Sequence, residues 1–426
     1  MPSPRQPEVP SSTIKPPTAR PQIKNTPQPE SGIEPIRVQQ SEVELITNNA
    51  DSGNAWGGHQ SRIVHTQDGI FTAYITSGTD EFSKQWHLVQ RQDDGTWAEM
   101  AVGNVGGQPA NLLAGPDGTL YLIGWPNGLG TLWTGNPENG KLEMVSSPIP
   151  NQASGNYPYT SAGINVEGVL CILSSTGGEN PVGWFNWSCY HPESGEWITQ
   201  VNKLDFRYCY TYVFPGPDGQ LSLISTRDVR WQVLGYEQPQ DAFDYVFNAY
   251  GLWHTENTSD VSMERVYLLA EEPNDQYPFV YLDAQQDAYL DTQGRMHIIY
   301  RIQGPSTNNE SVSRHAILST NGTLIVDLPL PQEAGEFSRI FQDKKERYYL
   351  IGSAGFLYPM DRNGIELGEP VQLDFARYDV EYSGFGLSVP RTGTPLSDVL
   401  DVVFPTNGGT DWVYFQLDFS DQVGSL

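Results

Sequence analysis

Residues able to exchange protons or bind a carboxylate recur at fixed distances from a series of Asp-Gly-type turns. Nine or ten positions before a turn glycine stand His59, Gln60, Tyr159 and Tyr210; six to eight positions after one stand Trp125, Arg227 and Arg301; Arg339 opens the matching segment of another repeat. Imidazole and phenol groups can move protons, and a guanidinium pairs bidentately with a carboxylate. The set suits a ligand that carries both hydroxyls and a carboxylate.

Each of these side chains also has a structural interpretation. His59 follows a Trp-Gly-Gly segment and could simply hydrogen-bond a loop. The tyrosines could be packing aromatics with satisfied hydroxyls, and Arg227 could pair with the adjacent Asp228. A further histidine, His65, lies inside a predicted strand, and we expect it to be structural.

The turns themselves form a repeat, because each separates two short strand-like runs. Gly115-Pro-Asp-Gly-Thr-Leu-Tyr-Leu-Ile123 returns almost unchanged as Gly216-Pro-Asp-Gly-Gln-Leu-Ser-Leu-Ile224. Seven turn centres are found, at Gly69, Gly118, Gly168, Gly219, Gly294, near Glu346 and near Gly393. They lie about fifty residues apart, with one longer step after Gly219 that indicates an insertion.

A second turn follows inside most repeats, as in Asp94-Gly95, Asn139-Gly140, Ser194-Gly195, Asn321-Gly322, Asn363-Gly364 and Asn407-Gly408. Two hairpins per repeat give four strands, and four-stranded units repeated radially are propeller blades. We predict an all-β, seven-bladed β-propeller over residues 41–426. Residues 41–46 should pair beside residues 412–417 and close the ring. A stack of sandwich domains would instead require breaks near residues 150 and 300, which are not found.

Propeller geometry predicts where a site would be. The Asp-Gly turn joins the innermost strand to the second, so the start of the first strand and the end of the second lie together at the opposite face. The residues named above should therefore surround the opening of the central channel, where ligands commonly bind. The insertion, expected between Trp231 and about Tyr281, is either a lid over this opening or decoration.

Composition limits the partners. The net charge of −27 disfavours nonspecific binding to nucleic acid, and no apolar run is long enough to span a bilayer. Residues 1–40 are rich in Pro, Ser, Thr and Gln, which predicts a disordered tail or linker. No apolar signal region follows Met1, so either the protein is cytoplasmic or its secretion signal has been removed from this sequence. The tail favours an extracellular or surface-tethered monomer.

Three cysteines are too few for a disulfide scaffold and show no metal-ligand spacing. Cys171 and Cys189 lie equally far from a loop centre near residue 180, so they should face each other across a hairpin of the third blade. A bond between them would form in an oxidising compartment. We expect no required cofactor, and the sequence neither demands nor excludes a structural Ca²⁺.

The repeat resembles two groups of proteins. The turn Asp93-Asp-Gly-Thr-Trp97 is similar to a shortened Asp box of the sialidase-like (BNR) propeller superfamily. Tyr210 before a turn and Arg227 after it resemble the layout of seven-bladed ulvan and rhamnose–glucuronate lyases. Those enzymes carry a second histidine about twenty residues after the first, where this chain has Thr79 and Asp80.

The lyase resemblance implies β-elimination beside a uronic acid of an acidic polysaccharide. An arginine would bind the carboxylate, Tyr210 or His59 would remove the proton from the neighbouring carbon, and the partner would protonate the leaving oxygen. By this resemblance His59, Tyr210 and Arg227 are catalytic, and the substrate-binding residues are Gln60, Trp125, Tyr159, Arg301 and Arg339. Two alternatives remain, a noncatalytic glycan- or protein-binding propeller and a sialidase-like glycoside hydrolase.

Overall fold

The computed structural model describes residues 33–420 except 56, 81, 139, 155–158, 177–181, 239, 241–243, 260–262, 271–280, 304–311, 335–336 and 379–384. For residues 281–286 and 303 it describes the backbone alone. Most of the predicted tail thus lies outside the described residues. Within them, strands dominate, and helix is limited to short 3-10 segments: Ser52–Ala55 (η1), Pro126–Gly128 (η2), Pro217–Gly219 (η3), Trp231–Leu234 (η4), Gln332–Ala334 (η5), Asp374–Arg377 (η6) and Pro390–Thr392 (η7).

Apart from one two-stranded sheet in the insertion, the strands of the described residues form seven antiparallel sheets of four or five strands in chain order, which confirms the predicted seven-bladed propeller. Blade 1 contains Ile63–Thr66 (β3), Gly69–Thr76 (β4), Lys84–Arg91 (β5) and Trp97–Gly106 (β6). Blade 2 contains Asn111–Ala114 (β7), Leu120–Gly124 (β8), Thr131–Gly135 (β9) and Val145–Pro148 (β10). Blade 3 contains Tyr159–Ile164 (β11), Leu170–Thr176 (β12), Gly183–His191 (β13) and Glu196–Leu204 (β14). Blade 4 contains Tyr208–Pro215 (β15), Leu221–Arg227 (β16), Ala249–Thr255 (β19) and Glu264–Ala270 (β20).

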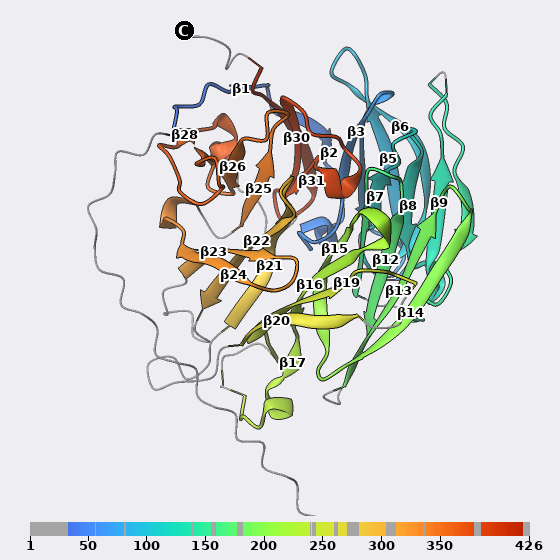
Figure 1. Ribbon diagram of the computed structural model, residues 1–426. Helices are drawn as coiled ribbons and strands as arrows, with labels where there is room; N and C mark the ends of the chain where they lie inside the picture. Colours follow the sequence, from blue (N-terminus) through green and yellow to red (C-terminus); the bar gives the residue numbers. More distant parts are fainter. Residues whose placement is uncertain are drawn as a thin grey trace, which may run out of the picture. The chain divides into compact units, whose positions relative to one another are not determined.

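Blade 5 contains Tyr281–Leu290 (β21), Arg295–Gln303 (β22), Val312–Ser319 (β23) and Leu324–Pro329 (β24). Blade 6 contains Ser338–Gln342 (β25), Tyr348–Gly352 (β26), Phe356–Pro359 (β27) and Val371–Gln372 (β28). Blade 7 contains Gly386–Leu387 (β29), Val399–Thr406 (β30), Asp411–Asp418 (β31) and, as its outer strand, Gln39–Gln40 (β1) with Glu44–Thr47 (β2). From blade 1 to blade 6, and again from blade 7 to blade 1, the first strand of a blade contacts the first strand of the next, so the sheets follow one another around a common centre (Figure 1).

The ring is closed by the N-terminal strands, as predicted. Glu44 of β2 pairs with Tyr414 of β31, and Gln40 of β1 pairs with Leu417. In Figure 1 the red strands β30 and β31 lie beside the blue strands β2 and β3. The pairing begins at Gln39, two positions before the predicted boundary at residue 41.

Glu44 also joins the last blade to the first. Its carboxylate accepts hydrogen bonds from the Arg91 guanidinium, with Nη2 at 2.6 Å, and from Nε1 of Trp97 at 3.1 Å. Both donors belong to blade 1. The contact at which the ring closes therefore combines backbone pairing with a charged hydrogen bond.

Every predicted first turn joins the first strand of a blade to its second strand. The turn glycines have positive φ, for example +86° at Gly118, and Glu346 takes the same region at +61°. Left-handed backbone is cheapest at glycine, which explains the recurring Asp-Gly pairs. We call the end of the blades that carries these turns the turn face, and the other end the opening face. Asn407-Gly408 differs from the other second turns because it joins β30 to β31, the second and third strands of its blade.

The apolar core lies between neighbouring blades rather than in one central mass. Tyr212, Tyr250 and Tyr300 pack between blades 4 and 5, while Tyr208 and Trp253 pack between blades 3 and 4. The inner strands therefore bury side chains against both adjacent blades, as in sheets that are covered on both faces. The first strands of the blades line the channel at the centre.

The insertion differs from the prediction. The extra residues connect β16 to β19 and include Val229–Arg230 (β17) and Tyr245–Val246 (β18). Residues 264–270, predicted to be part of the insertion, form β20, the fourth strand of blade 4. Val266, Tyr267 and Leu269 of this strand pack against the core between blades 4 and 5. Connections from second to third strands emerge at the opening face, so the insertion lies there.

The predicted cysteine pair is confirmed. Cys171 of β12 lies opposite Cys189 of β13, with a Cα–Cα distance of 4.0 Å, and the two form a disulfide. The third cysteine, Cys209, is free and buried. The disulfide links the second and third strands of blade 3.

A chain that begins at residue 48 should be less stable than one that begins at residue 33. The shorter chain lacks β1 and β2, so the outer edge of β31 and Arg91 both lose their partners. We expect the unfolding temperature to fall by more than about 5 °C, measured by scanning calorimetry. The chain from residue 33 keeps both strands and should unfold at the temperature of the full chain. Equal unfolding temperatures for all three chains would contradict closure by these strands.

Replacing Cys171 and Cys189 together by serine should lower the free energy of unfolding by about 3 kcal/mol, because the disulfide restricts the unfolded chain. Urea unfolding followed by tryptophan fluorescence measures this difference. Adding a reductant should destabilise the original protein to the same degree and leave the double variant unchanged. A reductant that has no effect on the original protein would count against the bond.

Candidate functional site

Three aromatic side chains from different blades meet at the opening face. The Tyr210 ring lies 5.5 Å from the His59 ring and 5.1 Å from the Tyr159 ring, in edge-to-face arrangements. Tyr159 begins the first strand of blade 3, Tyr210 lies in that of blade 4, and His59 precedes that of blade 1. We call these residues the opening cluster. The repeat offsets therefore identified three side chains that the fold brings together.

Tyr210 reaches this position because its strand is irregular. The pairing of β15 with β16 shifts register between Cys209 and Tyr212, and Tyr210 has a φ of +55°. A bulge re-aims a side chain, and a non-glycine residue in this region is strained by about 1–3 kcal/mol. Tyr208 and Tyr212 would share one face of a regular strand, yet they pack into the cores on opposite sides of blade 4. The bulge thus turns Tyr210 toward His59.

Burial fixes the protonation states of the cluster. Desolvation lowers the pKa of His59 to about 3, and the charges of Arg391, Arg62 and Arg339 add to this effect. The hydroxyl of Tyr210 has its pKa raised well above the ordinary value, first by burial and then by the neighbouring Tyr159. At neutral pH the imidazole is therefore neutral and the phenol keeps its proton. His59 can accept a proton, and Tyr210 can donate one.

Arg207 borders the cluster, a residue that the repeat offsets missed. Its guanidinium lies 5.5 Å from the centre of the Tyr159 ring and 4.6 Å from that of Tyr245 in the insertion. It also forms a 2.6 Å ion pair with Asp228, a buried carboxyl whose pKa burial raises. The insertion contacts Tyr210 as well, because the Phe247 ring lies 5.8 Å from it.

A polar cavity lies beside the opening cluster at the inner ends of blades 1, 5, 6 and 7. It measures about 30 Å³, room for roughly one water-sized group, and its polar lining is Gln60, Arg62, Asp287, Arg339 and Arg391. We call it the channel cavity. Burial and the charge of Arg339 lower the pKa of Arg62 to about 9. Burial raises the pKa of Asp287 to about 6, although Arg339 opposes the shift.

The lining groups are held by hydrogen bonds. Arg62 Nη2 donates to Gln60 Oε1 at 3.1 Å, and Arg339 Nε donates to the Phe385 carbonyl oxygen at 3.1 Å. Asp287 accepts from the Ile340 backbone N–H at 2.8 Å. Arg62 and Arg391 were not among the predicted site residues. Arg62 precedes the apolar pair Ile63-Val64, and a charge at the inner end of a buried strand is the signal that could have revealed it.

The other predicted residues are placed elsewhere. The Arg227 guanidinium lies 4.3 Å from the Phe206 ring centre, and its Nη1 is 3.4 Å from Asn248 Oδ1. In the pairing of β15 with β16, Arg227 lies opposite Tyr208, two positions before Tyr210. Trp125 is buried between blades 2 and 3 and donates to the Ala153 carbonyl oxygen at 3.0 Å. Arg301 lies near the end of β22, opposite Asp283.

Two features are absent from the residues that the structure describes. In this part of the chain, no three His, Cys, Asp or Glu side chains gather as they would around a metal ion. Across the same residues, no helix is long and apolar enough to cross a membrane.

The fold defines the chain as a seven-bladed β-propeller with four-stranded blades. No protein-family model matches the sequence, and no curated protein matches it. Structures with a similar arrangement include an α-L-arabinanase of Penicillium chrysogenum complexed with arabinobiose, at 8% identity over 73% of this chain and 94% of that one, TM-score 0.47. Streptogramin B lyase has 12% identity over 88% and 98%, TM-score 0.46, and BBS1N in complex with ARL6DN has 8% over 91% and 98%, TM-score 0.48. At these values no activity transfers to this chain.

Replacing His59 by glutamine should make the stability less dependent on pH. The pKa of His59 falls from 6.5 to about 3 on folding, so below pH 6.5 only the unfolded chain takes up this proton, and stability is lost as the pH falls. Between pH 7 and pH 5 the original protein should lose about 2 kcal/mol more free energy of unfolding than the variant. Urea unfolding at both pH values measures the difference, with Gln60→Ala as the control that keeps His59. Equal losses in all three proteins would exclude a buried neutral His59.

Proposed function

We propose that this propeller acts on an acidic oligosaccharide at its opening face and cleaves it beside a uronic acid by β-elimination. The observation that carries the proposal is the contact of His59 with Tyr210, a proton acceptor beside a proton donor, in the field of buried arginines. Those charges favour an anion next to the imidazole, as a uronate carboxylate would be.

The protonation states assign the two roles that the sequence left open. A ring nitrogen of neutral His59 takes the proton from the carbon beside the carboxylate. The electron pair of the broken C–H bond forms the new carbon–carbon double bond. The bond from the neighbouring carbon to the leaving oxygen breaks, and the Tyr210 hydroxyl gives this oxygen its proton. A bound carboxylate would offset the nearby arginine charges and raise the pKa of His59, which makes the imidazole a better base once substrate is present.

Access and surroundings fit an extracellular enzyme. His59 is 3% exposed and Tyr210 is 5% exposed, so substrate entry requires a covering segment to move. The insertion is the segment we assign to this lid, because its Phe247 contacts Tyr210. The Cys171–Cys189 disulfide favours an oxidising compartment. The elimination needs no cofactor, and we propose that the protein acts as a monomer related to the sialidase-like propellers.

A noncatalytic propeller that binds an acidic glycan is the second candidate. It is favoured by the pKa of His59, because a base with a pKa of about 3 lies far below the value that suits proton abstraction at neutral pH. In this case the opening cluster and the arginines would bind the sugar without cleaving it.

Ultraviolet absorbance separates the two candidates, because elimination creates a conjugated double bond. A panel of uronate-containing polysaccharides is incubated with the protein, and we expect one of them to give this signal. Tyr210→Phe, which removes only the hydroxyl, should lower kcat by about 10²–10⁴-fold, and His59→Gln should do the same. Tyr190→Phe is the matched control, because Tyr190 packs on Trp197 away from the opening and should keep full activity. Binding of a polysaccharide without absorbance change would support the second candidate, and full activity of Tyr210→Phe would refute the assigned proton donor.

A further inference from the structure

A second polar site lies at the turn face, around His65 of β3. Its Nδ1 is 2.8 Å from Oδ2 of Asp401 on β30. The Asp401 side chain is fully buried and also accepts hydrogen bonds from the Tyr414 hydroxyl at 2.7 Å and from Gln416 Nε2 at 3.0 Å. Burial opposes ionisation of Asp401, but the bond from His65 and these donors outweigh it and lower its pKa. The carboxylate is therefore an acceptor fixed in place, and it orients the imidazole.

The orientation of His65 leaves one ring nitrogen for another partner. Because the carboxylate of Asp401 can only accept, Nδ1 of His65 carries a hydrogen, and Nε2 lies on the other side of the ring. The bond to Asp401 also raises the pKa of His65. An imidazole can be neutral or protonated. Nε2 accepts in the first form and donates in the second. A hydroxyl group can bond to either form, because it is both a donor and an acceptor.

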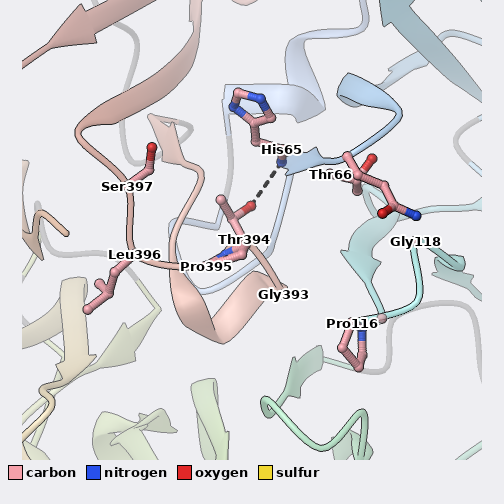
Figure 2. Close-up of a pocket in the computed structure, with 11 residues that line it drawn as sticks. His65, Thr66, Pro116, Gly118, Gly393, Thr394, Pro395, Leu396 and Ser397 are labelled. Carbon is pink, nitrogen blue, oxygen red and sulfur yellow. Dashed lines mark hydrogen bonds between the residues drawn. The ribbon is translucent and has the colours of Figure 1, made fainter. Parts of the chain in front are cut away.

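His65 lines a cavity of about 380 Å³, within the size range of small-ligand sites. Figure 2 shows how the wall is built from separate blades: His65 and Thr66 from blade 1, Pro116 and Gly118 from blade 2, and the segment Gly393–Ser397 from blade 7. The backbone N–H of His65 donates to the Thr394 hydroxyl at 2.9 Å, which ties the blade 7 segment to the histidine. We call this space the turn-face cavity.

The chemistry of the wall selects the ligand. Hydroxyl and amide groups of Thr66, Gln67 and Ser397 alternate with apolar surfaces of Pro116, Pro395 and Leu396, and no lysine or arginine occurs among the residues that line the cavity. Such a wall can pack on the C–H faces of a sugar ring while bonding its hydroxyls.

Charges around the turn-face cavity disfavour an anion. Asp401 lies behind His65, and Asp68 lies against Gly118 in the wall. Arg91 lies beyond Tyr414, with its guanidinium 5.5 Å from that ring, and is paired with Glu44. A carboxylated sugar would therefore meet carboxylates without a lining arginine, whereas a neutral sugar would not.

We propose that the turn-face cavity is a binding site for one neutral sugar unit, with a hydroxyl of the sugar bonded to Nε2 of His65. The site is independent of the proposed elimination, because it lies at the opposite end of the blades and uses none of the opening cluster. It would hold neutral carbohydrate whether or not the opening face is catalytic.

The direct test is a titration of the full protein with methyl glucoside, the neutral probe, and with methyl glucuronoside, its anionic match. The readout is the Cε1–H nuclear magnetic resonance signal of His65, identified by its loss in His65→Asn. Asparagine keeps a donor for Asp401 and removes Nε2. We expect a saturable shift of the His65 signal with methyl glucoside up to about 50 mM, and about tenfold weaker glucoside binding by His65→Asn in saturation-transfer experiments, the loss of one good hydrogen bond.

Two further variants keep the test decisive. Leu396→Trp fills the turn-face cavity from its loop side without touching the His65–Asp401 bond, and it should abolish the shift. His87→Asn is the matched control, because His87 bonds Glu99 on the outer strands of blade 1, and it should bind methyl glucoside normally. An unmoved His65 signal, a shift with methyl glucuronoside alone, or unchanged binding by Leu396→Trp would each overturn the proposal. Loss of elimination activity in other variants would leave it unaffected.

Discussion

Pairing of β31 with the N-terminal strands is the constraint on which the rest of the molecule depends. Without it blade 7 lacks its outer strand, and Arg91 and Trp97 of blade 1 lose the carboxylate of Glu44. Both candidate sites need a closed ring, because each collects side chains from blades that are far apart in the sequence. His65 meets Asp401 only when the first and last blades stand next to each other, and His59 meets Tyr210 of blade 4 across the ring.

The two faces of the propeller offer different chemistry for a geometric reason. At the opening face, first strands begin and second strands end, so long side chains converge on the axis and bury arginines near one another. At the turn face, tight turns rich in glycine and proline leave short side chains and a wider space. If both proposals hold, anionic and neutral ligands bind at opposite ends of the blades. The insertion, which could cover a bound ligand, lies at the opening face.

The sequence predicted the repeat and its consequences well. Turn residues such as Gly118 must have positive φ, and that local requirement is visible as Asp-Gly pairs, so blade number and strand order could be predicted. The facing cysteines and the convergence of His59 with Tyr210 came from the same register. A position along a strand does not tell which groups a long side chain will contact, so the contacts of Arg227 with Phe206 and Asn248 could not be predicted. The sequence did not reveal Arg391, because its repeat is the least regular and has a long connection to β30.

Closure of the ring also sets the order of events during synthesis on the ribosome. Glu44 is made long before its partner Tyr414. Until β31 has been made, the nascent chain carries a set of blades with open edges at both ends, and such edges invite pairing with other chains. The ring can therefore close only after β31 has emerged, and a chain that stalls before β31 would expose an unpaired edge that is prone to aggregation.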